Sequence, residues 1–258
     1  MSTLITIIVT FFAGMGAGLG TGFAGLSAAA VISPMLITFL GMDPYMAVGI
    51  ALSSDVLASA VSAYTYGKNK NIDVKNGLIM MVTVLCFTVV GSYVSSLVPS
   101  ATMGSFSVFM TFLLGIKFIV RPVMTTKEAM QGVSAKKRAI QSIICGVIIG
   151  FICGFIGAGG GMMMLLILTS VLGYELKTAV GTSVFIMAFT AFTGASSHFA
   201  IGGKPDWFVL FLCIAFTLLW ARIAAVFANK ASAKTLNRAT GIVLVILGIV
   251  VFAFSLLS

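Results

Sequence analysis

Two glycine-rich stretches interrupt apolar sequence in this chain, and their composition suits the binding of an anion. The second stretch is Gly157-Ala158-Gly159-Gly160-Gly161, and the first is Gly25-Leu26-Ser27-Ala28-Ala29. Adjacent glycines form helix poorly and adopt backbone angles closed to other residues, so each stretch predicts a break between two helices. A helix that starts after such a break presents free N–H groups and a positive dipole end. We therefore expect these residues to bind a small anion: Gly25, Ser27, Ala28, Gly157, Gly159, Gly160 and Gly161.

One carboxylate lies deep within an apolar segment. Asp55 follows Ser53 and Ser54 about ten residues from either end of segment 45–66, which is near the middle of a membrane-spanning helix. An ionisable residue at that depth is costly and is by default a functional hypothesis. Asp55 could bind a proton for coupling, hold a cation, or act as a structural hydrogen-bond centre. We expect a role in proton or ion coupling, with Ser53 and Ser54 binding substrate, so that Asp55→Asn would abolish any pH dependence of transport.

Hydroxyl side chains follow the second break. Thr182-Ser183 stands where Ile50-Ala51 stands in the first half. Hydroxyls can bind sulfonate or carboxylate oxygens without a fixed charge, although they also bond to the backbone of their own helix. We expect ligand contact at Thr182 and Ser183. For the later hydroxyls of the same segment, the bond to the helix backbone is the favoured interpretation; these are Thr190, Thr193, Ser196 and Ser197.

Composition places the chain in a membrane. Hydrophobic residues make up 60% of the 258 residues and charged residues only 8%, whereas soluble domains carry about 25% charged residues. The formal charge of +9 concentrates in a few loops, which indicates membrane topology rather than nucleic-acid binding. No Ser/His/Asp arrangement, paired carboxylates, CxxC pair or Cys/His cluster occurs. The sequence therefore predicts neither an enzyme, nor a metal site, nor a cofactor.

The apolar segments form two related halves. We expect helical legs at 4–24, 27–40, 45–66, 76–98, 103–120, 139–157, 160–172, 177–200, 206–228 and 238–257. A shift of 132 positions places Gly14, Gly18, Gly22 and Gly25 on Gly146, Gly150, Gly154 and Gly157. Glycines at GxxxG spacing are best explained by close helix packing. We therefore predict an N-terminal membrane repeat at 1–120, a basic cytoplasmic linker at 121–138 and a C-terminal membrane repeat at 139–258.

Charged loops predict that the two halves are inverted. Loop 67–75, the linker and loop 229–237 carry Lys and Arg, so the positive-inside rule makes all three cytoplasmic. An even number of crossings must then separate the linker from 229–237, which requires 139–157 and 160–172 to be two legs. Each half has five legs, and an odd number inverts the second half, as in many transporters. The legs 27–40 and 160–172 reach roughly 20 Å, which favours re-entrant half-helices.

The pattern resembles the sulfite exporter TauE/SafE family of membrane permeases. The first-half stretch runs from Gly22-Phe23-Ala24-Gly25 through Pro34 to Ala47-Val48-Gly49. The second runs from Gly154-Phe155-Ile156-Gly157-Ala158-Gly159-Gly160-Gly161 to Ala179-Val180-Gly181-Thr182-Ser183. The triple glycine usual in this family is replaced by Ser27-Ala28-Ala29 in the first half, and the usual proline is Leu166 in the second. The resemblance implies transport of small sulfur-containing anions, such as sulfite and organosulfonates, or of related carboxylates.

Together these features predict an all-α integral membrane protein of two inverted repeats, with 8–10 segments in all. We expect a secondary transporter that moves a small anion across the plasma membrane of a bacterium or archaeon by alternating access. Two other classes stay open, namely a passive anion channel and a membrane enzyme or assembly factor. The expected partners are a small anionic substrate and the lipid bilayer, without nucleic acid, and a homodimer is left open.

Overall fold

The protein is described here by a computed structural model that covers residues 3–96, 116–126, 134–156, 160–202 and 205–257. Every long element in these ranges is an α-helix and none is a strand, which confirms the all-α prediction. The helices are α1 (Thr3–Ala24), α2 (Ala29–Leu40), α3 (Pro44–Lys68), α4 (Val74–Ser96), α7 (Ala135–Ile156), α8 (Gly160–Ser170), α9 (Leu176–Gly202), α10 (Trp207–Lys230) and α11 (Ala233–Leu257).

Several of these helices can cross a membrane. By length and hydropathy, α1, α3, α9, α10 and α11 are long and apolar enough to span a bilayer, which takes about 20 apolar residues. Helix α2 is apolar but has 12 residues, so it reaches only about 18 Å along its axis. The chain is therefore a multi-pass membrane protein. Helix α2 by itself is too short to cross a hydrocarbon core of about 30 Å.

The helix bounds differ from the predicted segments by a few residues. Helix α7 begins at Ala135, so the last residues of the predicted linker 121–138 belong to its first turn. The predicted segment 103–120 lies mostly outside the described residues. Asp43 and Asp206 cap α3 and α10, because their carboxylates accept backbone N–H groups of the first helical turn, and Pro44 occupies the first helical position.

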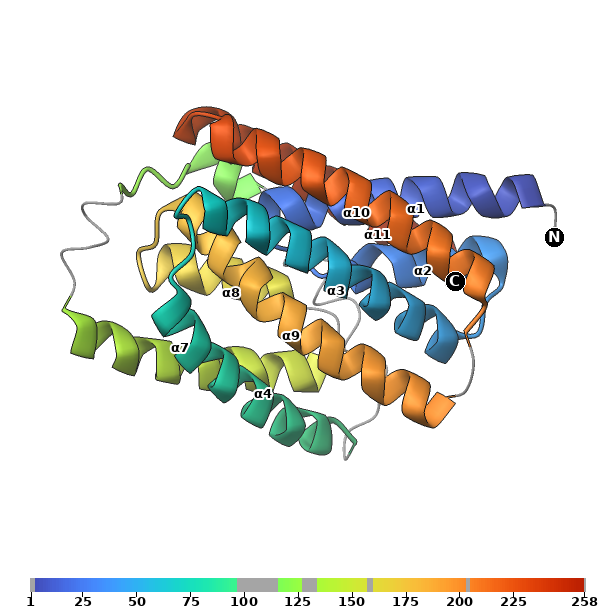
Figure 1. Cartoon of the computed structure of the whole chain (residues 1–258), viewed down its shortest axis with the longest axis horizontal. Helices are drawn as coiled ribbons and strands as arrows, with labels where there is room; N and C mark the ends of the chain where they lie inside the picture. Colours follow the sequence, from blue (N-terminus) through green and yellow to red (C-terminus); the bar gives the residue numbers. More distant parts are fainter. Residues whose placement is uncertain (1–2, 97–115, 127–133, 157–159, 203–204, 258) are drawn as a thin grey trace.

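Helices α3 and α9 lie side by side and run in opposite directions (Figure 1). Leu52, in the first half of α3, packs against Gly194 near the end of α9. Tyr66, near the end of α3, packs against Gly181 near the start of α9. The C-terminal end of α3 therefore lies beside the N-terminal end of α9.

Glycines allow two further helix pairs to approach closely, which confirms the packing interpretation of the GxxxG spacing. On α1, Gly14, Gly18 and Gly22 face the backbone of α10, and on α7, Gly146 and Gly150 face α4. A Cβ built on Gly18 would lie 2.6 Å from the Thr217 carbonyl oxygen, and one built on Gly150 would lie 2.5 Å from that of Val84. Small residues of this kind let membrane helices pack backbone to backbone.

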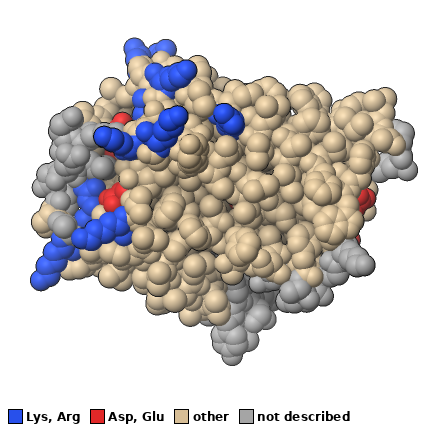
Figure 2. Space-filling model, in the orientation of Figure 1, with Lys and Arg blue, Asp and Glu red and all other residues tan. Residues whose placement is uncertain are grey.

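Charged residues mark one end of the bundle, which we call the basic end. Lys and Arg side chains gather there, while most of the visible surface between the two ends carries neither sign of charge (Figure 2). The basic end contains the C-termini of α3 and α10 and the N-termini of α7 and α9, because Asn71 contacts Asn229, and Asp73 contacts Arg138. Under the positive-inside rule we expect this end to face the cytoplasm.

Replacing Gly18 by alanine should weaken the α1–α10 pair. Its new Cβ would meet backbone atoms within 3 Å, whereas the Cβ of Gly16→Ala would meet only the methyl ends of Val31 and Leu247 at 3.2 and 3.3 Å. Overpacking of this kind costs about 1–3 kcal/mol. We expect Gly18→Ala to lower the melting temperature in detergent clearly more than Gly16→Ala does. Equal melting temperatures for the two variants would contradict the packing.

Candidate functional site

The first predicted break is present between α1 and α2. Helix α1 ends at Ala24 and α2 begins at Ala29. Between them Gly25 has a φ of +63°, a left-handed conformation that favours glycine. This turn lies within the protein, because Leu26, Ser27 and Ala28 are all buried. The chain therefore reverses its path inside the helix bundle, as the glycine pattern predicted.

Hydroxyl groups satisfy the carbonyl groups that this break leaves free. A helix that ends within a membrane leaves up to four carbonyl groups without helical partners, and lipid supplies none. Four carbonyl oxygens of the break accept a side-chain O–H, three of them from other helices. The pairs are Tyr66 to Gly22 at 2.8 Å, Thr240 to Phe23 at 3.1 Å, Ser183 to Gly25 at 3.1 Å and Thr21 to Leu26 at 2.9 Å.

The start of α8 packs directly against this first break. A Cβ on Gly161 would lie 2.6 Å from the Gly25 carbonyl oxygen and 2.9 Å from the Ser27 backbone nitrogen. Gly161 is therefore a position where only a hydrogen fits. Gly157 and Gly159 lie outside the described residues, whereas Gly160 is the first residue of α8. The first break and the N-terminus of α8 thus meet inside the protein, and we call this contact the junction.

Asp55 reaches the junction from α3. It is fully buried, Ser27 Oγ donates to its Oδ2 at 2.7 Å, and Ser59 Oγ donates to its Oδ1 at 2.8 Å. The backbone N–H of Ala28 also interacts with this carboxylate. Because Ala28 precedes the first turn of α2, the carboxylate lies at the positive end of the α2 dipole. Asp55 thus stands where the sequence predicted an external anion in the first half.

The other predicted hydroxyls divide into two groups. Ser183 reaches the junction through its bond to Gly25, and Thr182 accepts the backbone N–H of Asp73 at 3.1 Å. Ser53 and Ser54 instead donate to carbonyl groups one turn earlier in α3. Thr190 and Thr193 bond to the carbonyls of α9 in the same way. Ser196 is exposed, and the side chain of Ser197 lies outside the described residues.

Sequence reasoning missed four residues that bond within or beside the junction, and one of them is Thr21, which donates to the Leu26 carbonyl. Ser59 lies one turn after Asp55, and Tyr66 lies on the same face of α3, so helical spacing from Asp55 could have found both. Thr240 comes from α11, 217 residues away from its partner Phe23, and no local pattern indicates it.

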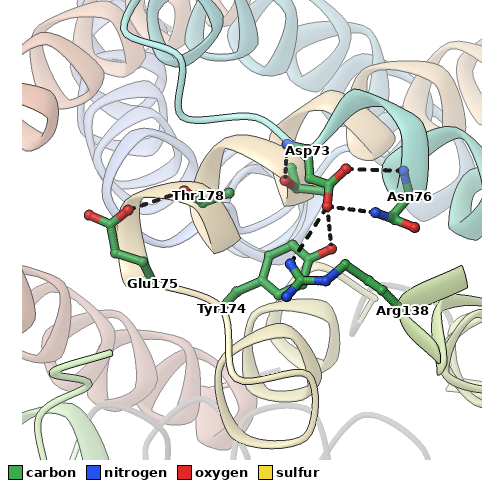
Figure 3. Close-up of polar contacts among 7 residues, drawn as sticks. Asp73, Asn76, Arg138, Tyr174, Glu175 and Thr178 are labelled. Carbon is green, nitrogen blue, oxygen red and sulfur yellow. Dashed lines mark hydrogen bonds and ion pairs between the residues drawn. The ribbon is translucent and has the colours of Figure 1, made fainter. Parts of the chain in front are cut away.

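A second polar cluster lies at the basic end and was also missed. Tyr174 donates to Asp73 Oδ2 at 2.8 Å, Arg138 lies 3.8 Å from the same oxygen, and Asn76 donates to it at 2.7 Å (Figure 3). The Arg138 guanidinium also lies over the Tyr174 ring, 4.9 Å from its centroid. Burial, together with the Asp73 carboxylate, raises the pKa of Tyr174, so its phenol stays protonated and remains a donor. These contacts join the loop after α3, the start of α7 and the loop before α9.

The two polar regions are connected through neighbouring residues of α9. Thr182 accepts a hydrogen bond from Asp73 in the basic-end cluster, and the adjacent Ser183 donates to Gly25 at the junction. A separate cavity of about 350 Å³ opens at the basic end and is lined by residues 123–126 and the first turns of α9 and α11. That cavity includes neither break, so we assign the candidate site from the contacts at the junction. The described residues contain no group of three potential metal ligands.

Removing the Tyr66 hydroxyl should destabilise the break. In Tyr66→Phe the buried carbonyl of Gly22 loses its partner, which costs about 1–3 kcal/mol. The matched control is Tyr64→Phe, since Tyr64 is 72% exposed on the same helix. We expect a lower melting temperature in detergent only for Tyr66→Phe. The hydrogen bond would be refuted as a stabilising contact if both variants melted like the parent chain.

Gly161→Ala tests the junction itself. The added methyl would collide with backbone atoms of Gly25 and Ser27, so it should force the breaks apart and destabilise the protein by about 1–3 kcal/mol. Gly67→Ala is the control, because its Cβ would make only an ordinary 3.5 Å contact with Ile72. A thermal melt that places Gly161→Ala at or above the control would show that the two elements do not touch.

Comparison with known proteins supplies the family. The sequence model of the family described as "Sulfite exporter TauE/SafE" matches residues 10–251. The Probable membrane transporter protein YunE of Bacillus subtilis is 26% identical and aligns over 96% of each chain. The Probable membrane transporter protein YdhB of the same organism is 23% identical over 88% of this chain and 90% of its own.

A Probable membrane transporter protein of Haemophilus influenzae is 24% identical over 85% of this chain and 84% of its own. No solved structure matches the chain. The family match covers nearly all the described helices, including both sides of the junction. This chain therefore belongs to the sulfite exporter TauE/SafE family of membrane transporters.

Proposed function

We propose that this chain is a secondary transporter that carries a small anion across the plasma membrane by alternating access between two inverted-topology repeats. The repeats are residues 1–120 and 139–258, and the basic stretch 121–138 joins them on the cytoplasmic side. The substrate class is sulfite, an organosulfonate or a related carboxylate. The single observation that carries the proposal is the contact of Gly161 with the backbone of Gly25 and Ser27, which joins the helix break of one half to the helix start of the other.

The order and length of the helices support the two repeats. Adding 132 to the bounds of α1, Thr3–Ala24, gives 135 and 156, which are the bounds of α7. The same shift turns the bounds of α3, Pro44–Lys68, into 176 and 200, close to Leu176–Gly202 of α9. The helix contacts correspond as well. If α7 is the counterpart of α1 and α10 is the counterpart of α4, then the α1–α10 contact corresponds to the α7–α4 contact. The opposite directions of α3 and α9 support inversion of the second half.

The chemistry of the junction supports a small anion as substrate. A helix N-terminus presents backbone N–H groups without helical partners and the positive end of the helix dipole, and α8 begins at Gly160. The position equivalent to Asp55 in the second half is Met187, so the second half places no carboxylate there. An anion can therefore bind beside α8 without meeting a fixed negative charge of the same repeat. The name of the family supports a sulfur oxyanion.

Asp55 supports coupling to protons. A buried carboxylate at the junction repels an anionic substrate while it is ionised, and a proton would remove that repulsion. Asp55 is therefore the proton-coupling residue in this proposal, and Ser183 and Gly161 line the substrate site. The basic-end cluster of Asp73, Arg138 and Tyr174 closes the cytoplasmic side in this arrangement.

Counterflow in proteoliposomes tests the proposed function. Vesicles that hold the purified protein are loaded with unlabelled sulfite or methanesulfonate and diluted into a trace of the labelled anion. A carrier exchanges label across the membrane, so we expect transient accumulation above equilibrium. A passive channel gives equilibration without stimulation from the opposite side.

Two controls complete this experiment. Protein-free vesicles measure leakage of the anions, and vesicles with Gly67→Ala test an alteration far from the junction. We expect Gly161→Ala to lose counterflow while Gly67→Ala keeps it. Equilibration of the label without trans-stimulation would contradict a carrier and indicate a channel. Binding of the anion without any flux would indicate an enzyme or assembly factor.

A further inference from the structure

The Ser27 hydroxyl is already engaged in this structure. It donates to Asp55 Oδ2 at 2.7 Å and accepts from the Ala29 backbone N–H at 3.3 Å. A serine hydroxyl carries one hydrogen, so Ser27 has none to offer to an anion while the Asp55 carboxylate is ionised. The position of Ser27 in the break predicts that it contacts a ligand, yet its hydrogen bond to Asp55 prevents that contact. One chemical event, protonation of Asp55, changes which of these two roles is available.

We propose that a proton on Asp55 reverses this hydrogen bond and releases the Ser27 hydrogen to the substrate anion. This inference rests on the proposed transport function and names the coupling device within it. A proton from water adds to Oδ2, and the new O–H donates to Ser27 Oγ. The Ser27 O–H then turns towards the junction and donates to the anion. Release of both on the other side restores the first state, so one proton and one monovalent anion cross together without net charge movement.

Four carbonyl groups near Ser27 already accept a hydroxyl hydrogen from another residue. A serine in a helix usually donates to the carbonyl four residues earlier. For Ser27 that group is Phe23, and it already accepts from Thr240. The carbonyls of Gly22, Gly25 and Leu26 likewise accept from Tyr66, Ser183 and Thr21. These bonds compete with the released hydrogen for the local carbonyls, and in this proposal the hydrogen goes to a ligand at the junction, where Ser27 lies beside Gly161.

Ser59, the other hydroxyl on Asp55, cannot transmit the same signal. It lies within α3 and donates to Oδ1 at 2.8 Å. If Asp55 donated to it, Ser59 could turn to the carbonyl of Asp55 itself, one turn earlier, as Ser54 does with Ile50. Its change of partner would stay within one helix. Ser27 belongs to the break, so only its reversal reaches the substrate site.

The contacts of Asp55 are hydrogen bonds. Both carboxylate oxygens lie at ordinary O–H···O distances from hydroxyls. Helices α1 and α2, which pack on α3, carry no titratable side chain.

Helices α9 and α10 also pack on α3, and their charged and titratable residues are Lys177, His198, Cys213, Arg222 and Lys230. Lys177 donates to the Asn229 carbonyl at the basic end, and the side chain of His198 lies outside the described residues. On α10, Cys213 is buried, while Arg222 and Lys230 are exposed. The groups that contact the Asp55 carboxylate among the described residues are Ser27, Ser59 and Ala28.

Proton uptake on anion binding tests the inference. Titration calorimetry of the purified full-length chain with methanesulfonate, in buffers of different ionisation enthalpy, counts the protons taken up per anion bound. Methanesulfonate stays anionic across the pH range, and sulfite, corrected for its own titration, replaces it if methanesulfonate does not bind. For the parent chain we expect about one proton per anion, and a Kd that falls about tenfold for each unit of decreasing pH while Asp55 is ionised.

Three variants separate the hydroxyl reversal from simple charge repulsion. Ser27→Ala should still bind the anion, about tenfold to a hundredfold more weakly at low pH, because a hydrogen bond to a charged group is lost. Repulsion by Asp55 still links its binding to a proton, but the weakening should fade as pH rises, because in the parent chain ionised Asp55 holds the Ser27 hydrogen and the two Kd values should converge. Asp55→Asn, whose amide can donate to Ser27 permanently, should bind without uptake at every pH. Thr65→Val, which removes a hydroxyl bonded only within α3, should behave like the parent chain.

The outcomes distinguish this inference from the proposed function. If the parent chain binds neither anion and shows no counterflow, both fail together. If it binds and exchanges the anion while Ser27→Ala weakens binding equally at every pH, or not at all, repulsion by Asp55 alone couples the proton and the hydroxyl reversal is overturned. If proton uptake persists in Asp55→Asn, another group binds the proton and the reversal is likewise overturned. A Ser27→Ala effect confined to low pH, with loss of uptake in Asp55→Asn and retention in Thr65→Val, supports the reversal.

Discussion

The carbonyl groups exposed at the break between α1 and α2 must find hydrogen-bond partners inside the protein, because lipid supplies none. Tyr66 from α3, Ser183 from α9 and Thr240 from α11 each donate a hydroxyl to one of them. These bonds bring helices from distant parts of the sequence to a single point. The positions of α3, α9 and α11 around the junction therefore depend on where α1 ends.

Close packing fixes the other side of the same point. Gly161 has backbone atoms of Gly25 and Ser27 where a side chain would be. A polar backbone that is broken at this depth can be tolerated when protein covers it, and here the start of α8 is part of that cover. The glycine at 161 and the hydroxyls around the first break thus serve one structural requirement.

The two halves differ most at the residue that carries charge. The carboxylate of Asp55, a residue of α3, lies beside the start of α2. Met187 is the residue at the equivalent sequence position of the second half. The first stretch also has Ser27, which supplies a hydroxyl that glycine lacks.

Contacts at the basic end extend from this point. The backbone N–H of Asp73 donates to Thr182, and the next residue, Ser183, bonds to the junction. The cluster of Asp73, Arg138 and Tyr174 is therefore joined to the junction through two adjacent residues of α9. Movement of α9 relative to the first half would strain both regions together. This connection offers a physical route by which a change at the junction could alter the basic end.

The sequence alone determined the helical class, the position of the first break and the buried carboxylate. These properties are local: apolar runs need lipid or protein around them, glycine favours the left-handed angle found at Gly25, and Asp55 is conspicuous in an apolar helix. Helical spacing from Asp55 could also have indicated Ser59 and Tyr66. The partner of each free carbonyl could not be predicted, because Thr240 lies 217 residues from Phe23.

Only the tertiary structure decided which predicted hydroxyls reach the junction. Ser53 and Ser54 bond to their own helix, whereas Ser183 crosses to Gly25. The tertiary structure also decided that Ser27 contacts Asp55. It decided as well that Arg138, which the sequence placed in the linker, lies in α7 and pairs with Asp73. The physical reason is that a hydrogen bond depends on distances of about 3 Å and on direction. Helix packing sets both, and residue type and spacing along the chain do not.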